Sequence, residues 1–159
     1  MSMTILCVGR MKEKPYRQMA DEYRRRLGRY GKFEEIEVPD LPEPSHSSPA
    51  LEEAVKKKEG EQLLARLRTS DYVIAMTIDG ARRDSEDLSR HLTQLTVQGH
   101  SSIVFVIGGS LGLSEDVRQR ADEELSMSPM TFPHQLARVM LYEQIYRAMK
   151  IASGERYHK

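Results

Sequence analysis

The chain has no tryptophan, a single cysteine and no long apolar run, and each absence excludes a class of protein. With Cys7 alone no internal disulfide can form, and the cysteine and histidines lack zinc-ligand spacing, so we expect no metal. No stretch approaches the roughly 20 apolar residues of a membrane span, and no basic region precedes an apolar core at the start. The 159 residues therefore predict one domain, 1–159, in the cytoplasm and without a membrane.

The net charge is also zero, but basic and acidic side chains are distributed unequally along the chain. Residues 10–32 hold nine basic side chains against three acidic ones, and residues 129–159 hold five against two. The middle of the chain, 33–128, holds ten against nineteen. Basic ends around an acidic middle indicate a surface for a polyanion, although charges spread over solvated faces would fit equally well.

Short apolar segments alternate along the chain with amphipathic ones, which predicts an α/β fold with a mostly parallel sheet flanked by helices. The alternation of Glu35, Ile36 and Glu37 predicts a strand with one wet face. Cys7 lies in an apolar strand pattern and is expected to be buried filler. The predicted strands are 4–9, 33–38, 72–78, 103–107 and 125–128, and the predicted helices are 15–28, 50–67, 85–96, 114–124 and 133–152.

A double glycine ends the most apolar strand. The run 103–107 has no alternation, which is typical of a strand buried on both faces. Gly108 and Gly109 let a ligand approach the main chain at the carboxyl end of this strand, where open α/β sheets bind ligands. Glu115 and Asp116 then open the next helix without a lysine, so a polyphosphate is not expected there. A tight turn without any ligand is the alternative.

The last predicted helix is apolar around most of its circumference. Its polar stripe is narrow and consists of Glu143, Arg147 and Lys150. A helix this apolar is expected to be buried on two sides, so we predict a twofold homodimer in which the sheet covers one side and the partner covers the other. Arg138 stands opposite the stripe and needs a carboxylate, carbonyl groups or a phosphate, unless it snorkels to water.

Motifs in the last third of the chain resemble those of one enzyme family. They are Ile107–Ser114, Ser126–His134, Arg138, Glu143–Ala148 and Tyr157–Lys159. Together with Val8-Gly9 at the end of the first strand and the segment Lys58-Glu59-Gly60, they resemble the RlmH family of SPOUT methyltransferases over essentially the whole chain.

The resemblance implies a deep trefoil knot within about residues 72–159, an exception to the rule that chains do not thread loops. It also implies S-adenosyl-L-methionine as the methyl donor, held by three loops. A sulfonium donor without phosphate agrees with the acidic residues that follow the glycine loop. The residues implied to bind the donor are Met76, Gly108, Gly109, Met127, Ser128, Pro129, Met130, Thr131 and Phe132.

The acceptor implied by the resemblance is nitrogen-3 of a pseudouridine in large-subunit (23S) ribosomal RNA, methylated in the assembled ribosome. A chain this small has no separate RNA-binding domain, so the dimer and its basic patches are implied to dock the ribosome, with both subunits shaping one active site. The candidates for RNA contacts are Arg10, Lys12, Arg17, His134 and Lys159.

Methyl transfer to this nitrogen requires loss of its proton, for which a base with a pKa near neutrality is best matched. His158 is the first candidate for the base, because it lies in a tail that can fold over the nucleotide, with Tyr157 beside it. His134 is the second candidate. The residues implied to orient the base or bind phosphate are Arg138, Glu143 and Arg147. The last two would equally suit an ordinary helix ion pair worth about 0.3–0.5 kcal/mol.

Two other functions fit the same sequence. One is a noncatalytic ribosome-binding or assembly factor that keeps the fold, which a donor-binding measurement would distinguish from an enzyme. The other is a SPOUT methyltransferase that acts on transfer RNA. Mass spectrometry of ribosomal RNA from cells with and without the gene separates all three possibilities.

Overall fold

Five parallel strands form one sheet in the order β2-β1-β4-β3-β5 in the computed structural model, which describes residues 1–159. This confirms the predicted α/β class and the parallel sheet. The strands are β1 (Ser2–Val8), β2 (Lys32–Val38), β3 (Tyr72–Arg82), β4 (Ser102–Ile107) and β5 (Glu123–Ser126). The helices are α1 (Lys14–Leu27), α2 (Pro49–Leu64), α3 (Ser85–Val97), α4 (Glu115–Arg120) and α5 (His134–Ala152).

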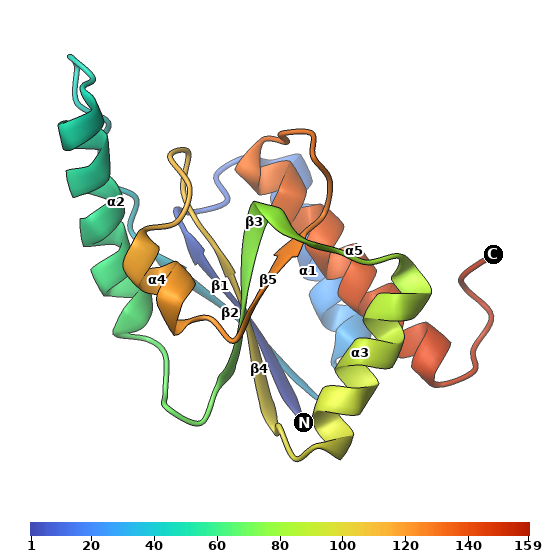
Figure 1. Ribbon diagram of the computed structural model, residues 1–159. Helices are drawn as coiled ribbons and strands as arrows, with labels where there is room; N and C mark the ends of the chain where they lie inside the picture. The colour runs from blue at the N-terminus through green and yellow to red at the C-terminus, as the bar shows by residue number, and fades with distance from the viewer.

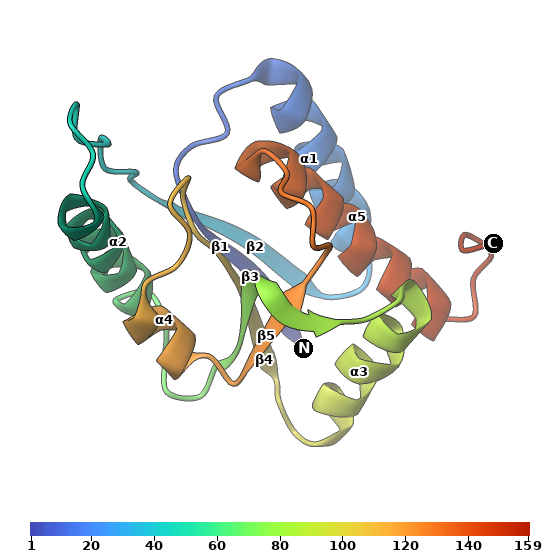
Figure 2. The ribbon, with the colours of Figure 1, turned by 45° about the horizontal axis from the view of Figure 1, so that its top comes forward.

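The helices are divided between the two faces of the sheet (Figures 1 and 2). α1, α3 and α5 cover one face, and α2 and α4 cover the other. The connections β1 to β2 and β3 to β4 run in one direction across the sheet on the first face. The connections β2 to β3 and β4 to β5 run in the opposite direction on the second face. Opposite directions on opposite faces give crossovers of the same hand, as parallel sheets require.

The central strands are buried on both faces, which explains their continuous apolar sequences. Cys7 and Phe105 pack toward α1, α3 and α5, whereas Leu6 and Val106 pack with residues of α2 and α4. Burial raises the pKa of the Cys7 thiol to about 12, so this cysteine is not a ready nucleophile. The prediction that Cys7 is a buried core residue is confirmed.

α5 is buried by its own chain. It lies on the sheet between α1 and α3 and packs against both of them. Tyr142 and Ile145 are 0% exposed, although no partner subunit is present. The apolarity of this helix is therefore accounted for within one chain and does not itself require a dimer, which remains a prediction.

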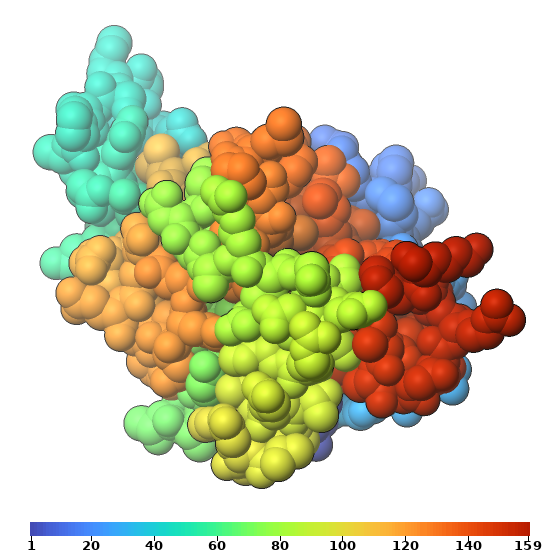
Figure 3. Space-filling model, turned by 45° about the vertical axis from the view of Figure 1, so that its right-hand side comes forward, coloured from blue at the N-terminus to red at the C-terminus, as the bar shows by residue number.

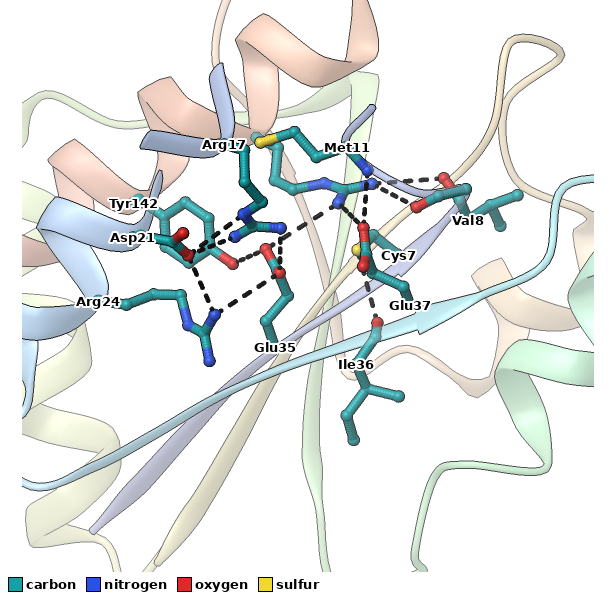
Figure 4. Close-up of polar contacts among 12 residues, drawn as sticks. Cys7, Val8, Met11, Arg17, Asp21, Arg24, Glu35, Ile36, Glu37 and Tyr142 are labelled. Carbon is teal, nitrogen blue, oxygen red and sulfur yellow. Dashed lines mark hydrogen bonds and ion pairs between the residues drawn. The ribbon is translucent and has the colours of Figure 1, made fainter. Parts of the chain in front are cut away.

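The polar face of β2 is not wet, contrary to the prediction from its alternation. Glu35 and Glu37 point toward α1 and α5, because their register partners in β1, Ile5 and Cys7, belong to that core. The Glu35 side chain is only 4% exposed and lies 2.7 Å from a guanidinium nitrogen of Arg17. Buried carboxylates of this kind are tolerated because arginines from the covering helices pair with them (Figure 4).

Arg138 of α5 is the most buried arginine in this network, with a side chain 1% exposed. Its Nη1 lies 2.6 Å from Glu37 Oε2, and its Nη2 donates to the carbonyl oxygen of Gly9 at 2.9 Å. Glu37 Oε2 also accepts from the main-chain N–H of Met11 at 2.9 Å. The predicted need for a carboxylate or carbonyl groups is thus met, and α5 is tied to the carboxyl ends of β1 and β2.

β3 and α4 differ in length from the predicted elements. β3 continues past Asp79-Gly80 to Arg82, because Ala81 and Arg82 return to pair with β5. α4 ends at Arg120 instead of residue 124, because Ala121 is extended (φ −64°, ψ 141°) and β5 begins at residue 123. Both differences arise from the pairing of β5 with β3, which cannot be predicted from the local hydrophobic pattern.

We expect the Arg138–Glu37 pair to be a main determinant of stability. R138M removes the cation but keeps the bulk, which leaves the half-buried carboxylate of Glu37 and the main-chain carbonyls of Val8 and Gly9 without their partner. The free energy of unfolding should fall by about 3–5 kcal/mol, measured by urea denaturation. R25M is the matched control, because the Arg25 side chain is 73% exposed. Its loss should lower the free energy of unfolding by less than about 1 kcal/mol. Equal losses in the two variants would contradict this assignment.

Candidate functional site

A cleft of about 770 Å³ opens at the carboxyl ends of β3 and β4, a volume typical of small-molecule sites. Three segments line it: the end of β3, the glycine loop after β4, and the loop between β5 and α5. In Figure 1 these segments meet at the top of the sheet. The lining residues are Met76, Thr77, Ile78, Ile107, Gly108, Gly109, Ser110, Leu111, Gly112, Leu125, Met127, Ser128, Met130, Thr131, Phe132, Pro133, His134 and Ala137.

The structure brings together every residue predicted to bind the donor except Pro129, which is exposed and does not line the cleft. Sequence reasoning missed Thr77, Ile78 and Ala137 among others. The first two could have been found from their place directly after Met76 in a strand. Ala137 is one helical turn beyond the predicted motif, and only the position of α5 brings it to the cleft.

The glycine loop is shaped by a close approach of its own main chain. A Cβ atom on Gly108 would lie 2.7 Å from the carbonyl carbon of Gly112, so no side chain fits there. Gly112 adopts a φ of +86°, which favours glycine, and its N–H donates to the carbonyl of Gly109 at 3.0 Å. The loop therefore presents bare main chain to the cleft.

Two serines shape the opposite loop. The hydroxyl of Ser126 donates to the carbonyl oxygen of Ser128 at 3.1 Å, and the hydroxyl of Ser128 accepts from the N–H of Met130 at 3.0 Å. Such local bonds fix a turn without help from neighbouring elements. The 127–132 loop consequently has its own internal support.

The cleft is electrically neutral along its walls. No aspartate, glutamate, lysine or arginine lines it, and His134 is its one histidine. α5 begins at this wall without an acidic residue in its first turn and without a side-chain cap, so the positive end of the helix dipole faces this region. The walls therefore carry no charged side chain, and the start of α5 is the source of positive potential among them.

A buried carboxylate supports the glycine loop from the α2 side. Glu59 is 5% exposed, and its Oε1 would lie 3.2 Å from a Cβ on Gly109. Its Oε2 accepts from the N–H of Leu41 at 3.1 Å. Burial raises the pKa of the Glu59 carboxyl, and the nearby charges of Asp40 and Glu43 add to the effect.

Four of the predicted catalytic residues form a second cluster, at the carboxyl-terminal half of α5. The phenol of Tyr157 donates to Glu143 Oε1 at 3.1 Å, and Glu143 pairs with Arg147. The Arg147 guanidinium carbon lies 4.7 Å from the centre of the Tyr157 ring, and its Nη1 is 3.3 Å from His158 Nδ1. The tail is thereby folded back on α5, and His158 Nε2 lies 3.9 Å from Glu86 Oε1 on α3. Figure 3 shows the C-terminal segment, in red, next to the yellow-green α3.

This tail cluster and the cleft lie toward opposite ends of α5. Arg147 follows His134 by thirteen residues, which corresponds to about 20 Å along a helix. Figure 1 shows the C-terminus beyond the end of α5 that is remote from the cleft loops. Arg138 belongs to neither place, because its side chain is buried against β1 and β2. Within one chain, the predicted catalytic tail and the predicted donor loops are not brought together.

The predicted RNA-binding residues are also separated. Arg10 and Lys12 are exposed in the loop between β1 and α1, and Lys159 is exposed at the end of the tail. Arg17 is engaged by Glu35 at 2.7 Å and by Asp21 at 3.1 Å, which leaves it less available to phosphate. His134 lines the cleft itself.

The structure contains neither a metal-binding cluster nor a membrane-spanning helix. No three histidine, cysteine, aspartate or glutamate side chains lie close enough together to hold a metal ion. None of the helices combines the length and apolarity needed to cross a membrane.

The fold and the cleft agree with a family comparison. Residues 1–158 match a family model described as "predicted SPOUT methyltransferase". The chain therefore belongs to the SPOUT methyltransferases.

Within that class the chain is similar over its whole length to one particular enzyme. It is 54% identical to the "Ribosomal RNA large subunit methyltransferase H" of Shouchella clausii (strain KSM-K16) and 52% identical to that of Alkaliphilus oremlandii (strain OhILAs). Both comparisons span 159 residues and 100% of each chain. The resemblance to the RlmH family is confirmed.

We expect G108A to disable the cleft. Its new methyl group must displace the Gly112 carbonyl, which should cost about 1–3 kcal/mol of unfolding free energy and abolish calorimetrically measured binding of S-adenosylmethionine. G28A is the control, because a Cβ there meets only ordinary contacts and the backbone is helical. Wild-type binding by G108A would contradict the assignment of this loop.

We expect E59Q to stabilise the protein increasingly as pH rises. The folded-state pKa of Glu59 lies above its ordinary value of 4.5, so its protonated form favours folding below pH 4.5 and this contribution is lost as pH rises through the raised pKa. Glutamine stays neutral and can still accept from Leu41. Thermal unfolding across pH 4–8 should show a widening gap between E59Q and wild type, and no such gap for E61Q, whose site is exposed. A gap that is constant with pH would contradict the argument.

Proposed function

We propose that this protein is an S-adenosylmethionine-dependent methyltransferase that methylates nitrogen-3 of a pseudouridine in 23S ribosomal RNA, in assembled ribosomes of the cytoplasm. The observation that carries the proposal is the neutral cleft against the bare main chain of Gly108, in a chain that is 54% identical along its length to a ribosomal RNA large subunit methyltransferase H. We also expect the C-terminal part, about residues 72–159, to be knotted within a single domain.

The residues present fit the donor. The volume of the cleft suits a nucleoside with a short side chain, and its walls carry no positive side chain that would repel a sulfonium ion. Met76, Gly108 and the 127–132 loop would hold it. When bound, S-adenosylmethionine supplies an electrophilic methyl group and leaves as a neutral thioether. The protein's own contribution to this step is mainly alignment.

The acceptor requires removal of a proton, and two histidines are the candidates for the base. His134 lines the donor cleft, and His158 lies in the tail beside Tyr157. Burial and the charge of Glu143 raise the pKa of Tyr157 to about 12, so this phenol stays protonated at neutral pH and acts as a hydrogen-bond donor. We assign the general base to His158, with His134 as the alternative.

The separation of tail and cleft supports a homodimer with shared sites. Because about 20 Å of helix separates Arg147 from His134, the tail of one chain serves its own cleft poorly. Two copies of α5 packed antiparallel would bring the tail of each chain to the cleft of the other. Leu136 and Met140 are only half-buried on this helix and offer apolar surface for such a contact.

Ribosome docking would use the exposed basic side chains. Arg10 and Lys12 stand in the loop after β1, at the edge of the sheet that carries the cleft, and Lys159 ends the tail. Contacts of this kind to phosphates weaken steeply with salt. We expect the reaction to involve the ribosome, the donor and two copies of the chain, without a metal or a membrane.

The experiment that tests the proposal is methylation of ribosomes from cells lacking the gene, read by mass spectrometry of 23S ribosomal RNA. Wild-type protein should add one methyl group to a pseudouridine. H158A, or deletion of residues 157–159, should keep calorimetric donor binding and lose transfer. H46A, a histidine in the exposed loop before α2, is the control and should stay active.

Each other result has a definite meaning. Donor binding without any methylated RNA would favour the assembly factor, and methylated transfer RNA would favour the other substrate. Loss of both donor binding and transfer in H158A would contradict the role given to the tail.

A further inference from the structure

The pairing of β3 with β5 is interrupted where β3 borders the cleft. Met76 pairs with Leu125 of β5, and Ala81 pairs with the same residue, so residues 77–80 are excluded from the pairing. A Cβ on Gly80 would lie 2.7 Å from main-chain atoms of Glu124 and Leu125, so only glycine lets the chain return so closely. Irregularities of this kind re-aim side chains, and they are common beside active sites. Here the excursion places Thr77 and Ile78 in the cleft wall.

The hydroxyl of Thr77 has no partner within the protein. Its oxygen is buried and makes no hydrogen bond, although Thr77 lines the cleft. The other hydroxyls of the cleft differ: Ser110 donates to Glu43, Ser128 accepts from Met130, and Thr131 is exposed to water. A buried hydroxyl without a partner is costly and rare, and in this position a ligand in the cleft can satisfy it.

We propose that the Thr77 hydroxyl hydrogen-bonds the nucleoside part of the methyl donor; this rests on the proposed function. The walls next to Thr77 are apolar, with Met76, Ile78 and Leu125 among them, and no charged side chain is present to balance the carboxylate or ammonium of the donor's amino-acid part. A hydroxyl both donates and accepts, which matches a purine edge or a ribose hydroxyl. Thr77 is thus a binding residue.

The test compares T77V, which keeps the shape of the side chain, with T77S, which keeps the hydroxyl. Two probes are titrated by calorimetry: S-adenosylhomocysteine and 5′-deoxy-5′-methylthioadenosine, which lacks the amino-acid part. Loss of one hydrogen bond should weaken binding of both probes to T77V by roughly three- to tenfold, with binding to T77S close to wild type. T69V, at an exposed threonine in the turn before β3 and outside the cleft, should bind as wild type does.

A second measurement separates a binding role from a structural one. Without ligand, T77V should unfold at the same temperature as wild type or at a higher one, because valine removes a buried polar atom that has no partner. A lower melting temperature for T77V would show that the hydroxyl supports the fold and would overturn the proposal.

The remaining outcomes are also decisive. Unchanged affinity of T77V for both probes overturns the proposal, and weakened binding of S-adenosylhomocysteine alone overturns the assignment to the nucleoside. If wild-type protein binds neither probe, the proposed function itself fails and the role of Thr77 fails with it.

Discussion

The ion pair between the buried Arg138 and the half-buried Glu37 fixes where α5 lies, and both candidate sites depend on that helix. The arginine joins α5 to the carboxyl ends of β1 and β2, with a side chain only 1% exposed. The start of α5 forms one wall of the cleft, and its other half carries the folded-back tail. Because a charge buried this deeply must keep its partner, the helix has little freedom to slide along the sheet.

The position of α5 also separates the two groups of residues that the proposed reaction needs. The neutral cleft can take a donor, and the tail cluster holds the groups suited to proton removal and base orientation. A helix is rigid over the 20 Å or so between them, so a single chain cannot close one on the other by a small movement. The proposed antiparallel pairing of two chains resolves this, because it would bring the tail of each chain to the cleft of the other.

The sequence was informative where local pattern decides structure. The apolar run 103–107 predicted a buried strand, and all but one of the residues that the family motifs implied to bind the donor line the cleft. What could not be predicted depends on contacts between distant segments. Glu35 and Glu37 suggested a wet face, because nothing local says that arginines from α1 and α5 will cover them. The sequence also does not show that the Thr77 hydroxyl lacks a partner, because this follows from the β3–β5 pairing.

The most direct test of the shared site is to mix two inactive variants. G108A lacks a working cleft but keeps its tail, whereas a chain without residues 157–159 keeps the cleft and lacks the tail. After subunit exchange, a mixed dimer would contain one complete site, so ribosome methylation should return although neither variant methylates alone. If mixed dimers form and methylation stays absent, tail and cleft do not act across two chains, and the shared site does not exist.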